Sequence, residues 1–570
     1  MTALPSTGRD ILDWSWDHFE PHYRELQSRS LSADTVDAFL RDWSRVAELV
    51  AELEQRLSVA KTVNTADVQA EQRFNRFLEE VYPPSRSAEQ ALKEKLLDSG
   101  LQPEGFSVPM RNMRAQAELF REANVPLLAV EEKQGAEWDA IVGAQTITWD
   151  GQELPLPRLN PFYESPERAT RERAWRLAAG RRVEDRERIG RLWVRELENR
   201  RTIAANAGLP DYRAFRWRQL LRFDYGPEDN QAFHAAVKEV VAPALSRSLQ
   251  RRRERLRLDT LRPWDLRVDP LGSQPLRPFE KAAELETGIS RMFHALDPEL
   301  ASDFDRMSAA GLLDLESRKN KAPGGYCTSF SAAKEPFIFM NAAGVHNDVQ
   351  TLMHESGHAF HVFRTAGLPY LQQRSVGHEF AEVASMSMEL LAAPHLDRAA
   401  GGFYTPAEAA RARINHLEGM IGLWVRLMYI DAFQHWVYTH LDEAMDVDAC
   451  DASWSRLYRD FITEVDWTGL EAELANGWQQ VPHIHEVPFY IIEYAMAQLA
   501  AVQVWIQAKS DRDAALARYK QALTLGGTRS LPELFAAVGA PFRFDASVLG
   551  PAVDAIEAEI DALQEDLAKA

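Results

Sequence analysis

Helix-period patterning is the feature of this 570-residue sequence that most constrains its fold. Between Ser32 and Leu57, apolar residues recur at steps of mostly three and four, which places them on one face of an α-helix. Similar patterns cover residues 167–207, 230–258 and 406–444, and a further stripe runs from Val553 to Leu567. Such stripes are typical of helices packed on a core. We therefore predict a large, mostly α-helical body.

Strand-like runs are few. The clearest is Pro336–Met340, which reads PFIFM, and a weaker run lies around Ile147–Leu154. Proline and glycine cluster between Pro263 and Pro278, which indicates either a lobe boundary or a long surface loop. We predict one small β-sheet within the helical body.

The composition is that of an ordinary globular protein, with 45% hydrophobic and 26% charged residues. No run approaches the ~20 apolar residues that span a bilayer, and no secretory signal is visible at the N-terminus. Two cysteines, Cys327 and Cys450, provide no disulfide framework and favour a reducing compartment. A net charge of −20 argues against nucleic acid or anionic membranes as partners. We expect a cytoplasmic protein.

Residues 354–358 read His-Glu-Ser-Gly-His and carry the strongest chemical signal. On a helix that Asn347 or Asp348 can cap, His354 and His358 lie one turn apart on the same face. That separation suits two corners of a zinc tetrahedron. Glu355, beside the first histidine, is placed to accept a proton from a water molecule at the metal. The alternative is a helix with two ordinary histidines.

A catalytic zinc site needs a third protein ligand. The longer metzincin pattern requires glycine at 361 and histidine at 364, but the chain has His361 and Arg364. The ligand is therefore expected from a second helix, which offers Glu379, Glu382 and Glu389. Spacing does not choose between Glu379 and Glu382. Glu382 and Glu389 share a helix face, so one could bind the metal while the other orients a ligand imidazole.

These residues predict hydrolysis of peptide bonds at one Zn²⁺ per chain. Zinc polarises the scissile carbonyl and acidifies a water molecule, and Glu355 accepts the proton and returns it to the leaving amine. Cobalt or manganese stays open as the metal, because the ligand types narrow the choice without fixing it.

A downstream segment, residues 482–494, supplies candidate donors to the oxyanion. Tyr490 and Tyr494 are four residues apart and are expected on one helix face, with Pro488 in the first turn. His483 and His485 precede that helix on a predicted loop. Taken alone, aromatic residues at this spacing are more often core residues.

Two segments before the histidine motif are candidates for binding substrate. Gly324, Gly325 and Tyr326 form either a flexible loop over the cleft or a turn. The strand at Pro336–Met340 is either an edge strand that binds an extended peptide through its main chain or a buried hairpin strand.

Five blocks of sequence, in this order, resemble the thimet oligopeptidase and oligoendopeptidase F family of zinc peptidases. They are GGYCTSF from Gly324, KEPFIFMN from Lys334, HESGHAFH from His354, FAEVASM from Phe380 and HIHEVPFYIIEYA from His483. The N-terminal half resembles the family more loosely, through WSWDHFEPHY and through AANAGLPDYRAF near residue 205.

The resemblance implies a mostly helical protein with two lobes that enclose a deep channel, with zinc on its floor and short unstructured peptides as substrates. We assign residues 1–210 to an N-terminal helical lobe and 211–570 to a catalytic lobe, onto which the C-terminal helices could pack back. The resemblance makes Glu382 the third metal ligand. It also assigns His483, Tyr490 and Tyr494 to the substrate carbonyl, although His485 competes with His483 for this role.

The leading functional hypothesis is an oligoendopeptidase. A carboxy-dipeptidase on the same scaffold would need a cation near the zinc, for which Arg364, Arg374 and Lys334 are candidates. A metal-bearing peptide-binding protein without turnover is a third hypothesis, but it gives Glu355 no purpose. The oligomeric state stays open.

Overall fold

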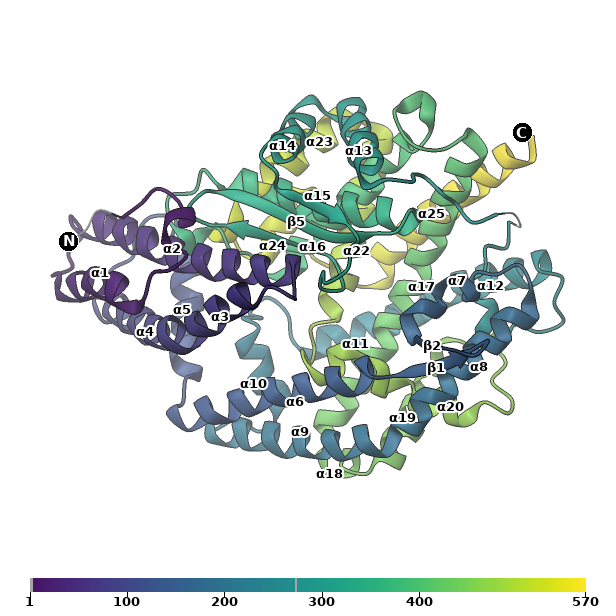
Figure 1. The fold of residues 1–570 in the computed structure, drawn as a ribbon, viewed down its shortest axis with the longest axis horizontal. Helices are drawn as coiled ribbons and strands as arrows, with labels where there is room; N and C mark the ends of the chain where they lie inside the picture. Colours follow the sequence, from purple (N-terminus) through teal and green to yellow (C-terminus); the bar gives the residue numbers. More distant parts are fainter. Residues whose placement is uncertain (1–3, 272–273, 570) are drawn as a thin grey trace. The chain divides into compact units, whose positions relative to one another are not determined.

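Most of the described chain is α-helical, and its strands form two small sheets (Figure 1). The computed structural model describes residues 4–271 and 274–569. The chain falls into two compact units, each assembled from three segments. Unit 1 comprises Met1–Glu118, Leu276–Ala409 and Ala500–Phe542, and unit 2 comprises Leu119–Pro275, Ala410–Leu499 and Arg543–Ala570. This division differs from the one at residue 210, which stays a prediction.

Unit 1 holds the three-stranded sheet and the helices packed with it. Its elements are α1 (Trp16–Ser28), α2 (Val36–Val63), α3 (Val68–Arg76), α4 (Tyr82–Asp98), α13 (Ala282–Leu296), α14 (Pro298–Ala309), β3 (Leu313–Glu316), β4 (Tyr326–Phe330), β5 (Glu335–Ala342), α15 (His346–Thr365), α16 (His378–Ala392), α23 (Arg512–Leu523) and α24 (Leu531–Ala537). Three helices run across the unit boundaries, namely α5 (Ser107–Leu119), α17 (Pro406–Thr439) and α22 (Ile492–Ser510).

Unit 2 is helical apart from one hairpin. Its elements are α6 (Val125–Gly143), β1 (Thr146–Trp149), β2 (Gln152–Pro155), α7 (Asn160–Tyr163), α8 (Arg168–Glu184), α9 (Arg186–Asn206), α10 (Tyr212–Gln219), α11 (Pro227–Ala236), α12 (Ala242–Arg255), α18 (Leu441–Ala444), α19 (Val447–Phe461), α20 (Glu471–Ala475), α21 (Pro482–His485) and α25 (Ala546–Lys569).

The predicted helical stripes are confirmed, although several are divided. The first stripe is the core face of α2, where Phe39, Trp43 and Leu53 are fully buried. The pattern over 167–207 spans α8 and α9, and the pattern over 406–444 spans α17 and α18. The apolar periodicity continues from one helix into the next because each helix of a pair buries an apolar face.

The three-stranded sheet has the order β3-β5-β4, so β5 is its central strand. It pairs in parallel with β3 and antiparallel with β4, with Cys327 opposite Ile338. The hypothesis that Pro336–Met340 is an edge strand is therefore wrong, and the buried hairpin strand is confirmed. Strand β4, which contains Tyr326, pairs with β5 and is an edge strand of the sheet.

The predicted small sheet is this three-stranded sheet, and the structure adds a second one. The run around Ile147–Leu154 is a two-stranded hairpin, β1 with β2, in unit 2. Its turn is made by Asp150 and Gly151, with φ of 49° and 82°. Positive φ at both turn residues matches the twist of the flanking strands and makes a two-residue hairpin loop favourable. The Asp-Gly pair was the signal in the sequence for this hairpin turn.

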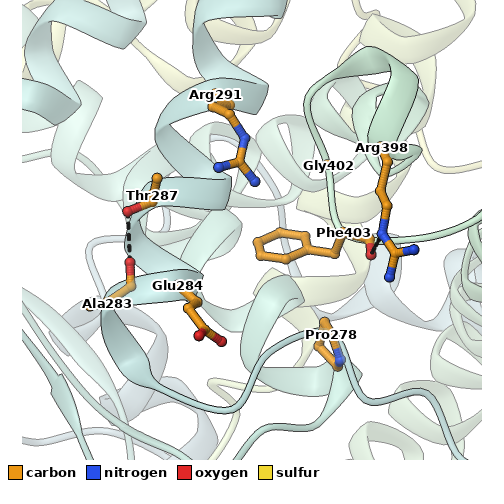
Figure 2. Close-up of a pocket in the computed structure, with 8 residues that line it drawn as sticks. All are labelled: Pro278, Ala283, Glu284, Thr287, Arg291, Arg398, Gly402 and Phe403. Carbon is orange, nitrogen blue, oxygen red and sulfur yellow. Dashed lines mark hydrogen bonds between the residues drawn. The ribbon is translucent and has the colours of Figure 1, made fainter.

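A surface pocket of about 630 Å³ lies in unit 1 beside α13 (Figure 2). Phe403, in the loop that follows α16, packs on α13 where Gly288 leaves room for its ring. A Cβ at Gly288 would lie 2.2 Å from that ring. The next residue, Tyr404, is hydrogen-bonded through its hydroxyl to His346 Nδ1 at 2.8 Å. This contact fixes the loop against the first turn of α15.

Within the described part of the chain, no helix is long and apolar enough to cross a membrane. Cys327 and Cys450 are free thiols, as expected from their number and separation.

Candidate metal centre

The histidine motif lies on α15, which follows β5 after a short turn. The helix begins at His346, one residue before the predicted capping residues. Asp348 instead reaches back from the first turn, and its Oδ2 accepts the main-chain N–H groups of Ala343 (2.8 Å) and Val345 (3.0 Å). These bonds satisfy main-chain donors at the start of the helix and fix the path from strand to helix.

His354, His358 and Glu382 meet at one point. The Oε2 atom of Glu382 lies 3.3 Å from His354 Nε2 and 3.7 Å from His358 Nε2. The three ligand atoms all lie within 4.8 Å of one another, and residues 4–271 and 274–569 contain no other such group of three His, Cys, Asp or Glu residues. Two imidazole nitrogens and one carboxylate oxygen are the donor types of a catalytic zinc site, in which three protein ligands leave one position for water.

Two residues hold these ligand side chains in place. Glu389 Oε1 lies 2.7 Å from His354 Nδ1, which leaves Nε2 of this ring to face Glu382. Ser385 donates its hydroxyl to Glu382 Oε2 at 2.8 Å. A carboxylate behind a histidine fixes its tautomer and ring orientation in metal sites. Glu389 therefore makes the contact with a ligand imidazole that helix spacing had suggested.

Burial and the carboxylates set the protonation of the two histidines. Burial lowers the pKa of His358 to about 4. Burial opposes protonation of His354 as well, but hydrogen bonds to Glu382 and Glu389 outweigh it and raise its pKa well above the usual range. Burial also disfavours the charged form of Glu382, yet the imidazoles lower its pKa to about 2. Glu382 is thus a charged carboxylate at neutral pH.

Glu355 is 8% exposed and lies beside this cluster. Burial raises its pKa to about 7, against the opposing effects of His354 and of the main-chain N–H of Cys327. A carboxyl group with a pKa near neutrality can both accept and return a proton at neutral pH. The N–H of Cys327 comes from β4, so this strand contributes directly to the surroundings of Glu355.

Gly357 lets α15 and α16 come into direct contact. A Cβ at Gly357 would lie 2.5 Å from the carbonyl oxygen of Ala384 and 2.6 Å from Cα of Ser385. No side chain fits there without moving one helix. From the α23 side, Tyr519 donates its hydroxyl to the same Ala384 carbonyl at 2.8 Å. The turn of α16 that follows Glu382 is therefore held from two directions.

His361 and Glu379, the two remaining candidates from the sequence, do not belong to the ligand group. His361 is 6% exposed and packs against Phe380, with ring centroids 5.9 Å apart, and burial lowers its pKa to about 4. Glu379 is buried in the first turn of α16. His361 is a core residue in this structure.

The three cations considered for binding a peptide carboxylate are all engaged elsewhere in unit 1. Arg364 pairs with Glu299 and with Asp303, the latter at 2.7 Å. Arg374 pairs with Glu48 at 2.8 Å, and Lys334 donates to the Ala366 carbonyl at 2.7 Å.

Gly324 and Gly325 are exposed and lie immediately before β4, of which Tyr326 is the first residue. The φ of Gly324 is +94°, a value that favours glycine. The ring of Tyr326 stacks on Phe339 of β5 with centroids 4.8 Å apart. The two glycines therefore lead into the edge strand β4, which begins at Tyr326. Contact of these residues with substrate stays a prediction.

His483, Tyr490 and Tyr494 are brought together in unit 2. The His483 ring lies 5.9 Å from that of Tyr490 and 6.2 Å from that of Tyr494, and the two tyrosine rings are 5.3 Å apart. All three are half-buried. Burial lowers the pKa of His483, with the charge of Arg426 acting in the same direction.

Two details of this segment differ from expectation. His483 lies on the single turn α21 and Tyr490 precedes α22, which begins at Ile492. The helix does not start at Pro488 because Phe489 has a φ of +66°, outside the helical region.

His485 is 1% exposed and its Nδ1 lies 3.0 Å from Glu196 Oε2. Its ring stacks on Trp138 and Trp478, with centroids 5.4 Å and 5.9 Å away. This placement makes His485 a core residue of unit 2 and favours His483 for a role at substrate.

Three contributors to the site were not singled out from the sequence: Gly357, Ser385 and the main-chain N–H of Cys327. A small residue inside the histidine motif was a signal for close helix packing, and a serine three residues after Glu382 was a signal for a helical hydrogen bond. Nothing in the sequence indicates the Cys327 contact, which depends on tertiary structure.

Replacing Gly357 with alanine tests the helix contact. The added methyl group forces α15 and α16 apart, which costs about 1–3 kcal/mol as overpacking does, and moves Glu382 from the histidines. We expect a lower Tm and weaker metal binding, measured by thermal denaturation and by competition with a chelator. Gly180→Ala is the control, because a Cβ there meets no atom within 4 Å. Equal metal affinity in both variants would contradict this role.

Replacing Glu389 tests the support of His354. Glu389→Ala removes both the hydrogen bond and the charge, so metal affinity is expected to fall roughly 10–100-fold. Glu389→Gln keeps an acceptor for the ring N–H and should lose less. Affinity is measured by equilibrium competition against chelators of known strength. If the two variants bind metal as wild type does, Glu389 does not orient His354.

The sequence from residue 162 to residue 549 matches the model of Peptidase family M3. The oligopeptidase PepF of Bacillus subtilis (strain 168) is 25% identical over 298 residues, which cover 50% of this chain and 42% of that protein. An oligoendopeptidase F homolog of Mycoplasma pneumoniae is 23% identical over 298 residues, covering 49% of this chain and 46% of that protein. The matches thus span less than half the length of these curated relatives.

Solved structures match over nearly the whole chain. PZ peptidase A, solved with an inhibitor, has a TM-score of 0.86 at 25% identity and covers 97% of both chains. An X-ray structure described as an oligoendopeptidase F has a TM-score of 0.87 at 25% identity, covering 96% of this chain and 97% of that one. The prediction of a mostly α-helical fold of this kind is confirmed. With the family model covering residues 162–549, the chain belongs to peptidase family M3.

Proposed function

We propose that this chain is a zinc-dependent oligoendopeptidase that hydrolyses internal bonds of short, unstructured peptides. The observation that carries the proposal is the meeting of His354, His358 and Glu382 within 4.8 Å, with Glu355 buried beside them. A site kept only for structure has no use for Glu355. Such sites are usually closed by four protein ligands, and neither Cys327 nor Cys450 belongs to the ligand group.

His354, His358 and Glu382 would hold the ion. When bound, a divalent metal supplies Lewis acidity toward a carbonyl oxygen and a water molecule. Glu355 accepts the proton as water oxygen attacks the scissile carbonyl carbon, and it delivers that proton to the leaving nitrogen as the C–N bond breaks. Its buried carboxyl, with a pKa raised by burial, suits both steps.

Charge that develops on the carbonyl oxygen needs further donors. By resemblance, we assign this role to Tyr490 and Tyr494, with His483 beside them. Their rings form one cluster in which every pair of centroids is 5.3–6.2 Å apart.

The three cations considered for binding a terminal carboxylate already have other partners, which favours endopeptidase activity over carboxy-dipeptidase activity. Arg364 and Arg374 are in ion pairs with carboxylates, and Lys334 caps a main-chain carbonyl. None of these three is available to bind a terminal carboxylate without losing a partner. We propose a cytoplasmic location, with short peptides as substrates.

Cleavage of a quenched-fluorescence peptide of eight residues, blocked at both ends, tests the reaction. We expect cleavage that a chelator abolishes and that added Zn²⁺ restores, because the ligands lose their metal and regain it. Products identified by mass spectrometry would locate the bond. Cleavage of the unblocked peptide alone would indicate an exopeptidase, and no cleavage by zinc-loaded protein would indicate a binding protein.

Glu355→Gln tests the proton transfer. The amide keeps the shape of the side chain but cannot accept the proton, so we expect kcat to fall by roughly 10²–10⁴-fold or more while zinc content and Tm stay close to wild type. Stopped assays give kcat, and elemental analysis gives zinc content. A zinc-loaded variant with wild-type kcat would exclude Glu355 as the base.

A further inference from the structure

Helix α2 contacts the edge strand β4, although the two are far apart in sequence. The side of α2 that faces the hairpin of β4 and β5 carries polar groups, in contrast to its apolar core side. We call it the strand-facing side of α2, and it consists of Glu52, Gln55, Arg56 and Thr62. Their spacing of three, one and six residues places them on one side of a helix.

Each of these residues contacts the hairpin. Thr62 Oγ1 lies 2.6 Å from the hydroxyl of Tyr326, at the start of β4. Gln55 Oε1 accepts the hydroxyl of Thr328 at 2.6 Å, in the middle of the strand.

The two remaining contacts lie at the other end of the hairpin. The Arg56 guanidinium lies 3.9 Å over the Phe330 ring at the end of β4. Glu52 Oε2 accepts the main-chain N–H of Ala333 at 2.7 Å, in the turn that follows. The contacts thus follow β4 from its first residue to the turn beyond its last.

The loop before β4 is tied to the same helix end. The main-chain N–H of Ala322 donates to the Thr62 carbonyl at 2.8 Å, and Arg318 donates to the carbonyl of Val63 at 3.1 Å. The loop and strand on either side of Gly324 and Gly325 are therefore both fastened to α2.

The placement of β4 along its own axis matters because Cys327 lies between Tyr326 and Thr328, the two residues whose side chains bond to α2. Tyr326 and Thr328 point toward α2, and β4 also packs against α15, the helix that carries Glu355. The main-chain N–H of the intervening Cys327 lowers the pKa of the Glu355 carboxyl. Among the described residues, β4 has a neighbouring strand on one side only, so β5 supports just one of its two edges. A shift of one strand position would replace this N–H by a carbonyl group.

We propose that the strand-facing side of α2 is a positioning surface that holds β4 against α15, with Cys327 beside Glu355. Gln55 and Thr62 are the positioning residues, since each bonds a β4 side chain next to Cys327. This inference rests on the proposed function and adds to it a role for the N-terminal segment. Helix α2 lies outside residues 162–549, the part matched by the family model.

Thr62 allows a matched test, because valine keeps its shape and serine keeps its hydroxyl. Thr62 and Gln55 are both half-buried, so Thr62→Val and Gln55→Met should fold. Ser58→Ala is the control on the same helix, because the Ser58 hydroxyl bonds no side chain among the described residues. The readouts are kcat and KM for the blocked peptide, zinc content, Tm, and hydrogen exchange of the amides of β4.

We expect Thr62→Val combined with Gln55→Met to lower kcat by about 10–100-fold, the scale of a misplacement near 1 Å. Amides of β4 should exchange faster in this variant, while zinc content stays unchanged. Thr62→Ser and Ser58→Ala should behave as wild type. If the β4 amides exchange faster but kcat is unchanged, the inference is overturned. It is also overturned if Thr62→Val and Gln55→Met each have the kcat of wild type.

The outcomes separate this inference from the proposed function. Wild-type protein that cleaves no peptide, or whose cleavage survives chelation, would overturn the zinc peptidase itself. Wild-type protein that cleaves in a zinc-dependent way, with unaffected α2 variants, would overturn only the positioning role.

Discussion

The contact of α15 with α16 at Gly357 is the constraint on which the metal centre depends. Because glycine lacks a Cβ, the backbone of α16 at Ala384 and Ser385 lies directly against α15. Glu382 is then carried to the imidazoles, and Glu389, two turns later, meets the far side of His354. Ser385 belongs both to the contact and to the hydrogen bond on Glu382. The packing of two helices and the charge distribution of the site are consequently set by the same turn.

Much of this site could be predicted from sequence because its residues act through helical spacing. His354 and His358 are one turn apart on one element, so local geometry alone brings them together. The same periodicity put Glu382 and Glu389 on one face, but it left Glu379 open, since only the crossing point of the two helices decides which glutamate reaches both imidazoles. That crossing point is set by Gly357, a tertiary effect.

The parts that could not be predicted depend on contacts between distant segments. His485 and His483 are two residues apart and look alike in sequence, yet His485 lies among Trp138, Trp478 and Glu196 from other segments. Strand order has the same limitation: the PFIFM run indicates a strand, but its central place in the sheet depends on a parallel partner, β3, that gives only a weak signal. Interleaving of three segments in each unit leaves no mark in composition, so composition does not indicate where the units of the structure begin and end.

The interleaving of chain segments also determines the order in which contacts can form while the protein is being synthesised. Unit 1 draws on residues up to Phe542, and Tyr519, near that end, supports the turn of α16 that follows Glu382. Helix α2 leaves the ribosome some 264 residues before its partner on β4. Contacts of such high sequence separation form late and slowly. A nascent chain therefore carries the histidine motif without its complete support, and the cluster of His354, His358 and Glu382 is complete only when nearly all of the polypeptide is available for folding.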